Sequence, residues 1–191
     1  MRIIGGSAAG VLLKAPKGFD VRPTPDLVRQ AVFNSLAPRI AGAVVLELFA
    51  GTGALSLESL SRGAARAVCV ESLARHAQFI RQNLALSRLA PETLEIRVQD
   101  AFAAVAQLAA MSQQFDLVFA DPPYGNKNVG RRSTSHAQEL LDHPGLPKLL
   151  RAGGLFVLGH AKRDRLEAPE IWAEAKILKH GDSWMRFLRT G

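Results

Sequence analysis

Five short apolar segments that alternate with helical patterns constrain the fold of this chain more than any other feature. Each is bounded by turn-forming or polar residues, as strands buried on both faces are, and they span residues 43–48, 67–71, 94–98, 115–120 and 155–158. Between the second and third, apolar residues recur at helical spacing from Leu73 to Leu84. Strands that alternate with helices form right-handed βαβ units, so the sequence predicts an α/β fold with a mostly parallel, doubly wound sheet.

Both ends of the chain predict a small antiparallel element. Residues 171–179 and 183–188 flank the turn sequence His-Gly-Asp, which predicts a terminal pair of antiparallel strands. Residues 2–4 and 11–15 flank a glycine-rich stretch and predict a short hairpin. The first pair would extend the sheet, and the hairpin would precede it.

A helix is expected directly before the first strand. Thr24 and Pro25 have the pattern of a helix N-cap and first helical residue, which predicts a helix from about Pro25 to Leu36. We therefore expect an N-terminal extension over residues 1–22 and a main domain over residues 23–191.

Composition and charge narrow the class of protein. Hydrophobic residues make up 48% of the chain and charged residues 21%, which excludes a disordered or collagen-like chain. The net charge of +7 favours a polyanionic partner such as nucleic acid, although many basic proteins only repel one another in solution. Cys69 stands alone, which excludes a disulfide framework and a cysteine-based zinc site. With no apolar run of membrane-spanning or signal-peptide length, we expect a cytoplasmic location and no membrane partner.

The segment LELFAGTGALSLE, residues 46–58, predicts a tight turn between a strand and a helix. Gly51 and Gly53 let the backbone turn sharply and approach a ligand closely. Ser56 stands where a dinucleotide fingerprint has its third glycine, and no Gly-Lys-Ser/Thr of a P-loop is present. Glu47 would repel a phosphate, so the segment fits a cationic ligand. The alternative is a turn that binds nothing.

Two acids close the next two predicted strands. Glu71 lies eighteen positions after Gly53, where doubly wound folds place a carboxylate on ribose hydroxyls. Asp100 follows the third strand and could reach the same crevice, because parallel strands end at one edge of a sheet. Alternatively, each acid only caps the helix that follows it.

The sequence Asp121-Pro122-Pro123-Tyr124, directly after the strand FDLVFA, is the most specific signal. Two prolines remove two backbone donors, so the carbonyls there are acceptors without competing N–H groups. Asp121 adds carboxylate acceptors, and Tyr124 can stack on a planar ring. The motif predicts a cradle for the amino group of a base, the alternative being a proline turn that only ends a strand.

Together these motifs resemble the S-adenosylmethionine-dependent methyltransferases that act on exocyclic amino groups. RIIGG at residues 2–6 and RPTPDLVRQAVFN at residues 22–34 narrow the resemblance to the RsmD family of bacterial 16S rRNA guanine-N2 methyltransferases. The resemblance covers essentially the whole chain. It implies a Rossmann-like methyltransferase fold, S-adenosylmethionine as cofactor, S-adenosylhomocysteine as product and no metal. The implied substrate is guanine 966 of 16S rRNA within a partly or fully assembled small ribosomal subunit, modified by a monomer.

The resemblance also assigns three groups of site residues. The cofactor group that it implies is Glu47, Phe49, Gly51, Gly53, Glu71, Asp100 and Ala101. In this group Glu71 would hold the ribose hydroxyls, and Asp100 with Ala101 would hold the adenine. The remaining four residues would surround the methionine portion. At the reacting amine it implies Asp121, Pro122, Pro123 and Tyr124. At the RNA it implies Arg2, Arg22, Thr24, Arg29, Asn34, Lys127, Arg131 and Arg132.

Some positions depart from the family pattern. Residues 7–10 read Ser-Ala-Ala-Gly where a basic turn is usual, and Gly159 stands before His160 where an acid is common. Residues 125–136 form a polar, turn-rich stretch that we expect to be a mobile loop. Its basic residues could replace the missing RNA contacts, or the loop could simply be solvated.

Two alternatives remain open from the sequence. Asp-Pro-Pro-Tyr presents similar acceptors to an adenine N6 amine of RNA or DNA, although DNA-modifying relatives usually carry a substantial target-recognition domain. A catalytically idle RNA-binding assembly factor could keep the same fold. The intact motifs at residues 49–53 and 121–124 argue against that second alternative.

Overall fold

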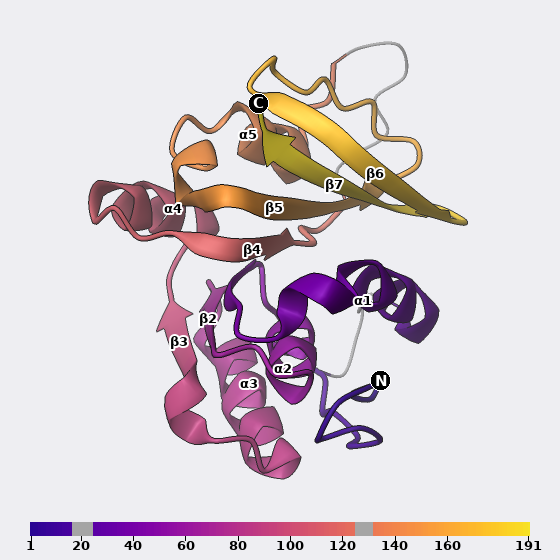
Figure 1. Ribbon diagram of the computed structural model, residues 1–191, viewed down its shortest axis with the longest axis vertical. Helices are drawn as coiled ribbons and strands as arrows, with labels where there is room; N and C mark the ends of the chain where they lie inside the picture. Colours follow the sequence, from indigo (N-terminus) through magenta and orange to yellow (C-terminus); the bar gives the residue numbers. More distant parts are fainter. Residues whose placement is uncertain (17–24, 125–131) are drawn as a thin grey trace. The chain divides into compact units, whose positions relative to one another are not determined.

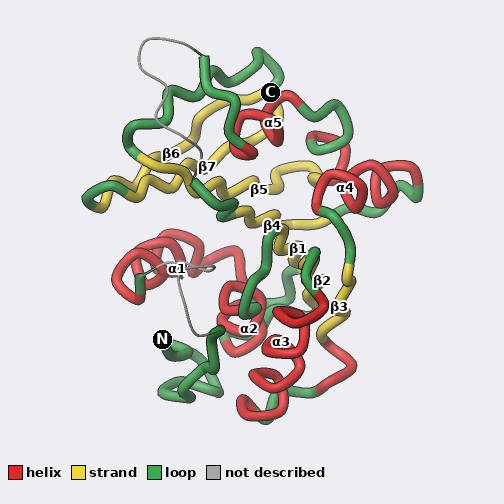
Figure 2. Tube along the Cα trace, turned by 180° about the vertical axis from the view of Figure 1, so that it is seen from behind, coloured by secondary structure: helices red, strands yellow, loops and turns green. Residues whose placement is uncertain are grey.

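The computed structural model describes residues 1–16, 25–124 and 132–191. The chain forms two compact units, residues 1–101 and residues 102–191, and each is described by itself (Figure 1). Helices and strands alternate along most of the N-terminal unit, whereas strands dominate the end of the C-terminal unit (Figure 2). In the part of the chain that is described, no helix is long and apolar enough to cross a membrane.

The N-terminal unit contains three parallel strands in the order β3-β2-β1. These strands are β1 (Val44–Leu48), β2 (Arg66–Glu71) and β3 (Leu94–Val98). Its helices are α1 (Asp26–Ile40), α2 (Ala54–Ser61), α3 (Ala74–Ser87) and the short 3-10 turn η1 (Pro91–Thr93). Helix α2 packs against β1 and β2, and α3 against β2 and β3. The central strand β2 is buried from residue 67 onward, as expected for a strand covered by helices.

The C-terminal unit contains four strands in the order β4-β5-β7-β6. Strands β4 (Phe115–Ala120) and β5 (Leu150–Ala161) are parallel, and β7 (Ser183–Thr190) runs antiparallel to β5 and to β6 (Trp172–His180). The remaining elements are α4 (Ala101–Ala110), α5 (His136–Asp142) and the 3-10 turn η2 (Pro147–Leu149). Buried Trp172 donates its indole N–H to the Leu141 carbonyl at 2.9 Å, which ties β6 to α5.

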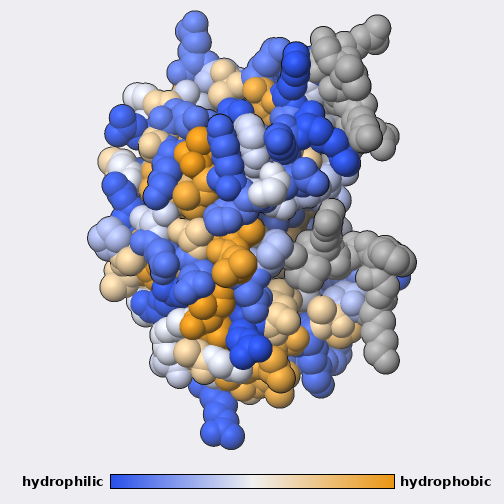
Figure 3. All heavy atoms as spheres, turned by 90° about the vertical axis from the view of Figure 1, so that its right-hand side faces the viewer, coloured by the Kyte–Doolittle hydropathy of each residue, from blue (hydrophilic) through white to orange (hydrophobic). Residues whose placement is uncertain are grey.

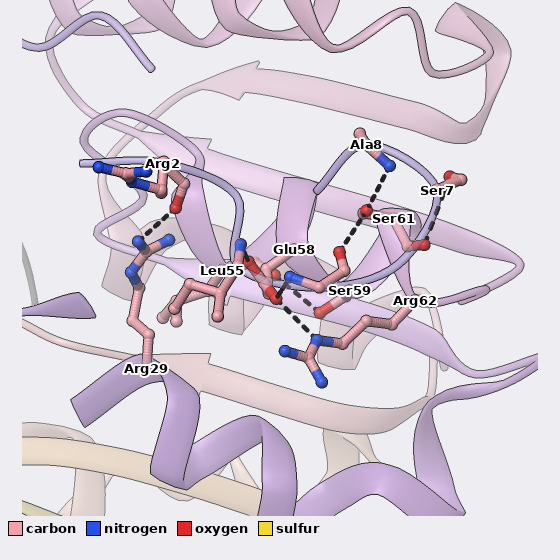
Figure 4. Close-up of polar contacts among 11 residues, drawn as sticks. Arg2, Ser7, Ala8, Arg29, Leu55, Glu58, Ser59, Ser61 and Arg62 are labelled. Carbon is pink, nitrogen blue, oxygen red and sulfur yellow. Dashed lines mark hydrogen bonds and ion pairs between the residues drawn. The ribbon is translucent and has the colours of Figure 1, made fainter. Parts of the chain in front are cut away.

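The N-terminal segment is held by α2 more than by its own strand pairing (Figure 4). Arg2 and Leu12 form an antiparallel bridge, and the Ile3 N–H donates to the Val11 carbonyl at 3.0 Å and the Leu13 N–H to the Met1 carbonyl at 3.1 Å, so the predicted hairpin is present but short. Buried Glu58 of α2 accepts the backbone N–H groups of Ile4 at 2.6 Å and Gly5 at 2.9 Å. A side chain at Gly6 would overlap the backbone of α2 at Ser61, so the glycines of RIIGG permit this close approach.

The structure corrects several predicted boundaries. Helix α1 begins at Asp26, with Pro25 at the N-cap instead of the first helical position. It continues past the predicted end at Leu36 to Ile40, whose side chain is buried. The predicted N-cap Thr24 lies outside the described residues. Leu73 precedes α3 and is exposed, so it is not part of the apolar face that Ala77, Ile80 and Leu84 form.

The fifth strand is longer than the predicted 155–158, because it begins at Leu150 and includes exposed residues 151–153 that carry no apolar signal. The expected segments at 94–98 and 115–120 match the bounds of β3 and β4, but the prediction that each is buried on both faces is wrong for β3, an edge strand of which only Leu94 is buried. The predicted terminal antiparallel pair is also present, as β6 and β7.

Both polar and apolar side chains reach the surface. Hydrophilic side chains cover much of the face in Figure 3, and apolar side chains are exposed among them. The large apolar residues that are exposed include Leu12, Leu27, Leu73, Leu86, Val98, Met111 and Ile171. Apolar surface of this kind, spread over separate elements, is ordinary for a folded protein.

Candidate active site

The glycine turn after β1 has the sharp geometry that the sequence predicts. Gly51 and Gly53 have φ angles of 54° and 72°, in the left-handed region that favours glycine. A Cβ atom at Gly53 would lie 2.8 Å from Cγ2 of Ile80 on α3, so a larger residue would push the turn away from that helix. Phe49 also has a positive φ of 56°, which is uncommon for a residue with a side chain. Such local strain is typical of functional turns, and no sequence pattern revealed it.

Glu47 has a structural task that the sequence did not reveal. Its side chain is buried, and its two carboxylate oxygens accept the backbone N–H groups of Leu55 at 3.2 Å and Ser56 at 2.8 Å, in the first turn of α2. Cys69 on β2 donates its thiol to the same carboxylate at 3.5 Å. Burial raises the pKa of Glu47 above its usual value, and these hydrogen bonds oppose the shift. Its contact with the methionine portion of a cofactor stays a prediction.

Glu71 links three pieces of the N-terminal unit at the end of β2. One carboxylate oxygen accepts the Gly51 N–H at 2.8 Å, and the other accepts the Leu73 N–H at 2.9 Å. The side chain is only 8% exposed, and Nδ1 of His76 lies 3.6 Å away. The structure thus brings together the glycine turn and the acid that the sequence predicted at one edge of the sheet. The alternative, that Glu71 caps the helix that follows it, is also supported in part, because Glu71 accepts the N–H of Leu73, the N-cap residue of α3.

Asp100 and Ala101 lie at the neighbouring strand end. The N–H of Gln99 donates to the Glu71 carbonyl at 3.1 Å, which brings the ends of β2 and β3 together. Asp100 is exposed there, and Ala101, the first residue of α4, is buried. Asp100 thus presents an exposed carboxylate at this strand end, and its expected contact with adenine stays a prediction.

Asn83 of α3 is a site residue that sequence reasoning missed. It is fully buried, and its amide nitrogen donates to the carbonyls of Thr52 at 3.0 Å and Lys14 at 2.9 Å. Its amide oxygen accepts the Lys14 N–H at 2.7 Å. One side chain therefore joins the glycine turn to the N-terminal segment. The available signal was a polar residue between Ile80 and Leu84, on the apolar side of the helix.

In the C-terminal unit, residues 121–124 follow β4 directly. Asp121 is half-buried, Pro122 is buried and Pro123 is exposed. The hydroxyl of Tyr124 donates to Oγ of Ser183, the first residue of β7, at 2.7 Å. Within the ranges that the structure describes, no cluster of three or more His, Cys, Asp or Glu side chains is placed to hold a metal ion.

The residues expected at RNA divide into three kinds. The expected surface position of Arg29 is wrong, because its side chain is fully buried. Its Nη2 donates to the Arg2 carbonyl at 2.6 Å (Figure 4) and to the Asp26 carboxylate at 2.7 Å. Arg2 and Asn34 are exposed. Arg132 is half-exposed and forms ion pairs at 2.6 Å with Asp142 and 3.3 Å with Glu167. Four positions lie outside the described residues, namely Arg22, Thr24, Lys127 and Arg131.

Most of the predicted loop 125–136 also lies outside the described residues. In the part that is described, the Ser133 N–H donates to the Arg165 carbonyl at 3.3 Å, and Ser135 caps α5 by accepting the Gln138 N–H. His136 is already the first residue of α5, so the irregular stretch is shorter than predicted at this end.

Comparison with known proteins identifies the family. The model of the family described as conserved hypothetical protein 95 matches residues 1–189. The chain belongs to this family. Ribosomal RNA small subunit methyltransferase D of Haemophilus influenzae is 34% identical over 176 residues, which cover 92% of this chain and 86% of that protein. The resemblance to the RsmD family is thereby confirmed.

Solved structures confirm the fold class. The structure of a proposed Escherichia coli methyltransferase, yhhF, is 31% identical with a TM-score of 0.78, and the match covers 100% of this chain and 97% of that one. The structure of a proposed S-adenosylmethionine-dependent methyltransferase from Streptococcus mutans has a TM-score of 0.69 at 15% identity, and the match covers 85% of this chain and 48% of that one. The predicted Rossmann-like methyltransferase fold is therefore correct.

Proposed function

We propose that this protein transfers a methyl group from S-adenosylmethionine to the N2 amine of guanine 966 in 16S rRNA of the small ribosomal subunit. Family membership and the name of the Haemophilus influenzae relative support small-subunit rRNA as the substrate. The observation that supports an amino group as the target is the motif Asp121-Pro122-Pro123-Tyr124, which follows β4 directly. The proposal includes a monomer that acts in the cytoplasm.

The residues of the N-terminal unit fit the proposed cofactor. The turn at Gly51 and Gly53 has left-handed φ angles and packs closely against Ile80 of α3 at Gly53, and the Glu71 carboxylate accepts the Gly51 N–H. Glu71 would hold the ribose hydroxyls, Asp100 with Ala101 the adenine, and the turn with Phe49 the methionine portion. When bound, S-adenosylmethionine supplies an electrophilic methyl group on a sulfonium.

The motif of the C-terminal unit would orient the nucleophile. The Asp121 carboxylate and the Pro122 carbonyl would accept the two hydrogens of the amine, which would hold the nitrogen in a fixed orientation. Tyr124 stacks on the base and excludes water from it. In the proposed transfer the amine nitrogen would take the methyl group from the sulfonium, which would leave as the thioether, and the amine would release one proton to water. Positioning and partial-charge stabilisation carry this step, so a strong base is not needed.

The target guanine must be accessible before this geometry can form. A guanine N2 amine is hydrogen-bonded inside a duplex, so the base must be unpaired or flipped out of the helix. The net charge of +7 suits a partner rich in phosphate. Exposed Arg2 and half-exposed Arg132 are candidates for sequence-independent phosphate contacts.

The test is methyl transfer from labelled S-adenosylmethionine to small ribosomal subunits purified from cells that lack this protein, followed by nucleoside analysis of the rRNA. Naked 16S rRNA is assayed in parallel, which decides whether the assembled particle is required. We expect N2-methylguanine with the wild type and none with Asp121→Ala. Methyladenine would replace the proposal with an adenine-N6 enzyme, and cofactor binding without transfer would favour an idle assembly factor.

A further inference from the structure

Four residues of β5 and β7 share one face of the sheet in the C-terminal unit. In this antiparallel pair, Gly159 is opposite Met185 and Ala161 is opposite Ser183. Opposed residues of a ladder lie on the same face, and so do residues two positions apart along a strand. Gly159, Ala161, Ser183 and Met185 therefore form one continuous patch, which we call the β5–β7 face.

Asp121 is seated against this face at Gly159. A Cβ atom at position 159 would overlap Oδ1 of Asp121 and would lie 2.8 Å from its Cγ. The same atom would lie 3.2 Å from Sδ of Met185, so the space is closed on a second side. The carboxylate thus occupies the volume that any residue other than glycine would fill. Backbone freedom is not the reason for this glycine, because its φ angle is not positive.

Tyr124 is held by the same face at Ser183. Its hydroxyl donates to Oγ of Ser183 at 2.7 Å, across 59 positions of sequence. The bond fixes the far end of the ring, while Pro122 and Pro123 restrict the backbone before it. The two side chains proposed to meet the guanine therefore contact two residues that are diagonal neighbours on the β5–β7 face.

We propose that Gly159 and Ser183 are positioning residues for methyl transfer, in that Gly159 sets the place of the Asp121 carboxylate and Ser183 sets the orientation of the Tyr124 ring. This inference rests on the proposed function. It adds that the acceptor geometry is determined by the strand pair β5 and β7 as much as by the motif at residues 121–124. A side chain at position 159 would move the carboxylate without removing it.

The main test compares Gly159→Ala with Gly154→Ala. A displacement of about 1 Å at a reacting centre costs about 100-fold in rate, so we expect a loss of that size in kcat for Gly159→Ala. Affinity for S-adenosylhomocysteine, measured by calorimetry, should stay unchanged, because the proposed cofactor residues belong to the N-terminal unit. Gly154 is the matched control on the same strand: its added Cβ would meet the carbonyl oxygens of Arg151 at 3.0 Å and Phe115 at 3.1 Å, away from Asp121. An equal kcat loss in both variants would overturn the inference.

Double-mutant cycles test whether the two residues act through their partners. Asp121→Ala and Asp121→Ala with Gly159→Ala should have the same residual activity. Tyr124→Phe and Ser183→Ala should each lower kcat/KM for the subunit about fivefold, the value of one hydrogen bond, and the double variant should be no worse than either. Additive losses in either cycle would contradict the proposed coupling.

Crystal structures separate failure of this inference from failure of the proposed function. If the wild type transfers no methyl group to subunits, the proposed function fails, and the placement of Asp121 can still be measured. We expect its carboxylate to be displaced in Gly159→Ala and unmoved in Gly154→Ala. An unmoved carboxylate in Gly159→Ala would overturn the inference whatever the substrate is.

Discussion

The two units hold their candidate site acids in opposite ways. In the N-terminal unit, Glu47 and Glu71 are buried and accept two backbone N–H groups each. In the C-terminal unit, Asp121 is half-buried and lies in space left by Gly159. The acids of the N-terminal unit are therefore tied to the backbone of the fold, whereas the place of the Asp121 carboxylate also depends on the absence of a side chain at position 159. Substitutions should combine loss of stability with loss of binding in the first unit and separate them in the second.

The largest combined effect is expected for Glu71→Ala. It leaves the N–H groups of Gly51 and Leu73 without their acceptor, which should lower the free energy of unfolding by about 3 kcal/mol. Affinity for S-adenosylhomocysteine should fall about 100-fold, because the turn loses its anchor and the proposed ribose contact together. Urea denaturation and calorimetry measure the two quantities. Glu95→Ala on β3 is the control, since the side chain of that acid is 40% exposed and pairs with Arg66 and Arg97. An equal effect there would contradict the comparison.

In the C-terminal unit, the free energy of unfolding should depend on pH through buried His160 of β5. Burial, followed by the charge of Arg186, lowers the pKa of His160 from 6.5 to about 4. Between these values the unfolded chain binds a proton that the folded chain does not. The contribution is therefore complete above pH 6.5 and is lost as the pH falls toward 4, by up to about 3 kcal/mol.

Denaturation at several pH values checks this dependence. His160→Gln should remove most of the change in that pH window, whereas His136→Gln, at an exposed position on α5, should leave it in place. If the free energy of unfolding of His160→Gln still fell between pH 6.5 and 4 as in the wild type, the assignment of this pH dependence to His160 would be contradicted.

A smaller effect is expected for Asn83→Ala. The substitution removes three hydrogen bonds and leaves backbone groups of Lys14 and Thr52 unpaired, at a cost of about 2 kcal/mol. Hydrogen exchange at the Lys14 amide should accelerate, and affinity for S-adenosylhomocysteine should weaken. Gln82→Ala, on the exposed side of α3, should change neither. Unaltered exchange at Lys14 would show that Asn83 does not hold the N-terminal segment.

The smallest effect is expected for Arg132→Ala. Its ion pairs with Asp142 and Glu167 involve half-exposed side chains, so the free energy of unfolding should change by less than about 1 kcal/mol. If Arg132 contacts phosphate, the salt dependence of subunit binding should decrease by about one counterion. A wild-type salt dependence would remove Arg132 from the proposed RNA contacts.

The sequence predicted the regular elements best where burial leaves a continuous apolar run. β4 matches its predicted segment for that reason, whereas β3 matches although charged residues interrupt it and only Leu94 is buried. The first part of β5 was missed because residues 151–153 are exposed and include two small residues. The neighbourhood of Gly51 and Glu71 was also predictable, since parallel strands end at one edge of a sheet.

Contacts that depend on packing could not be predicted. The residue type of Arg29 indicates a charge, but burial against the Arg2 carbonyl and Asp26 is a tertiary property. The partners of Glu47 depend on how α2 packs against β1. Likewise, the contact of Gly159 with Asp121 depends on the pairing of β4 with β5, which no local pattern specifies.

The most direct test of this account measures three properties of Asp121→Ala against the wild type: methyl transfer to small ribosomal subunits, affinity for S-adenosylhomocysteine and thermal stability. The account predicts that transfer falls about 1000-fold, as expected when acceptors that stabilise a transition state are removed, while affinity and stability stay near wild-type values. Retained transfer, or a loss of cofactor affinity as large as the loss of transfer, would contradict it.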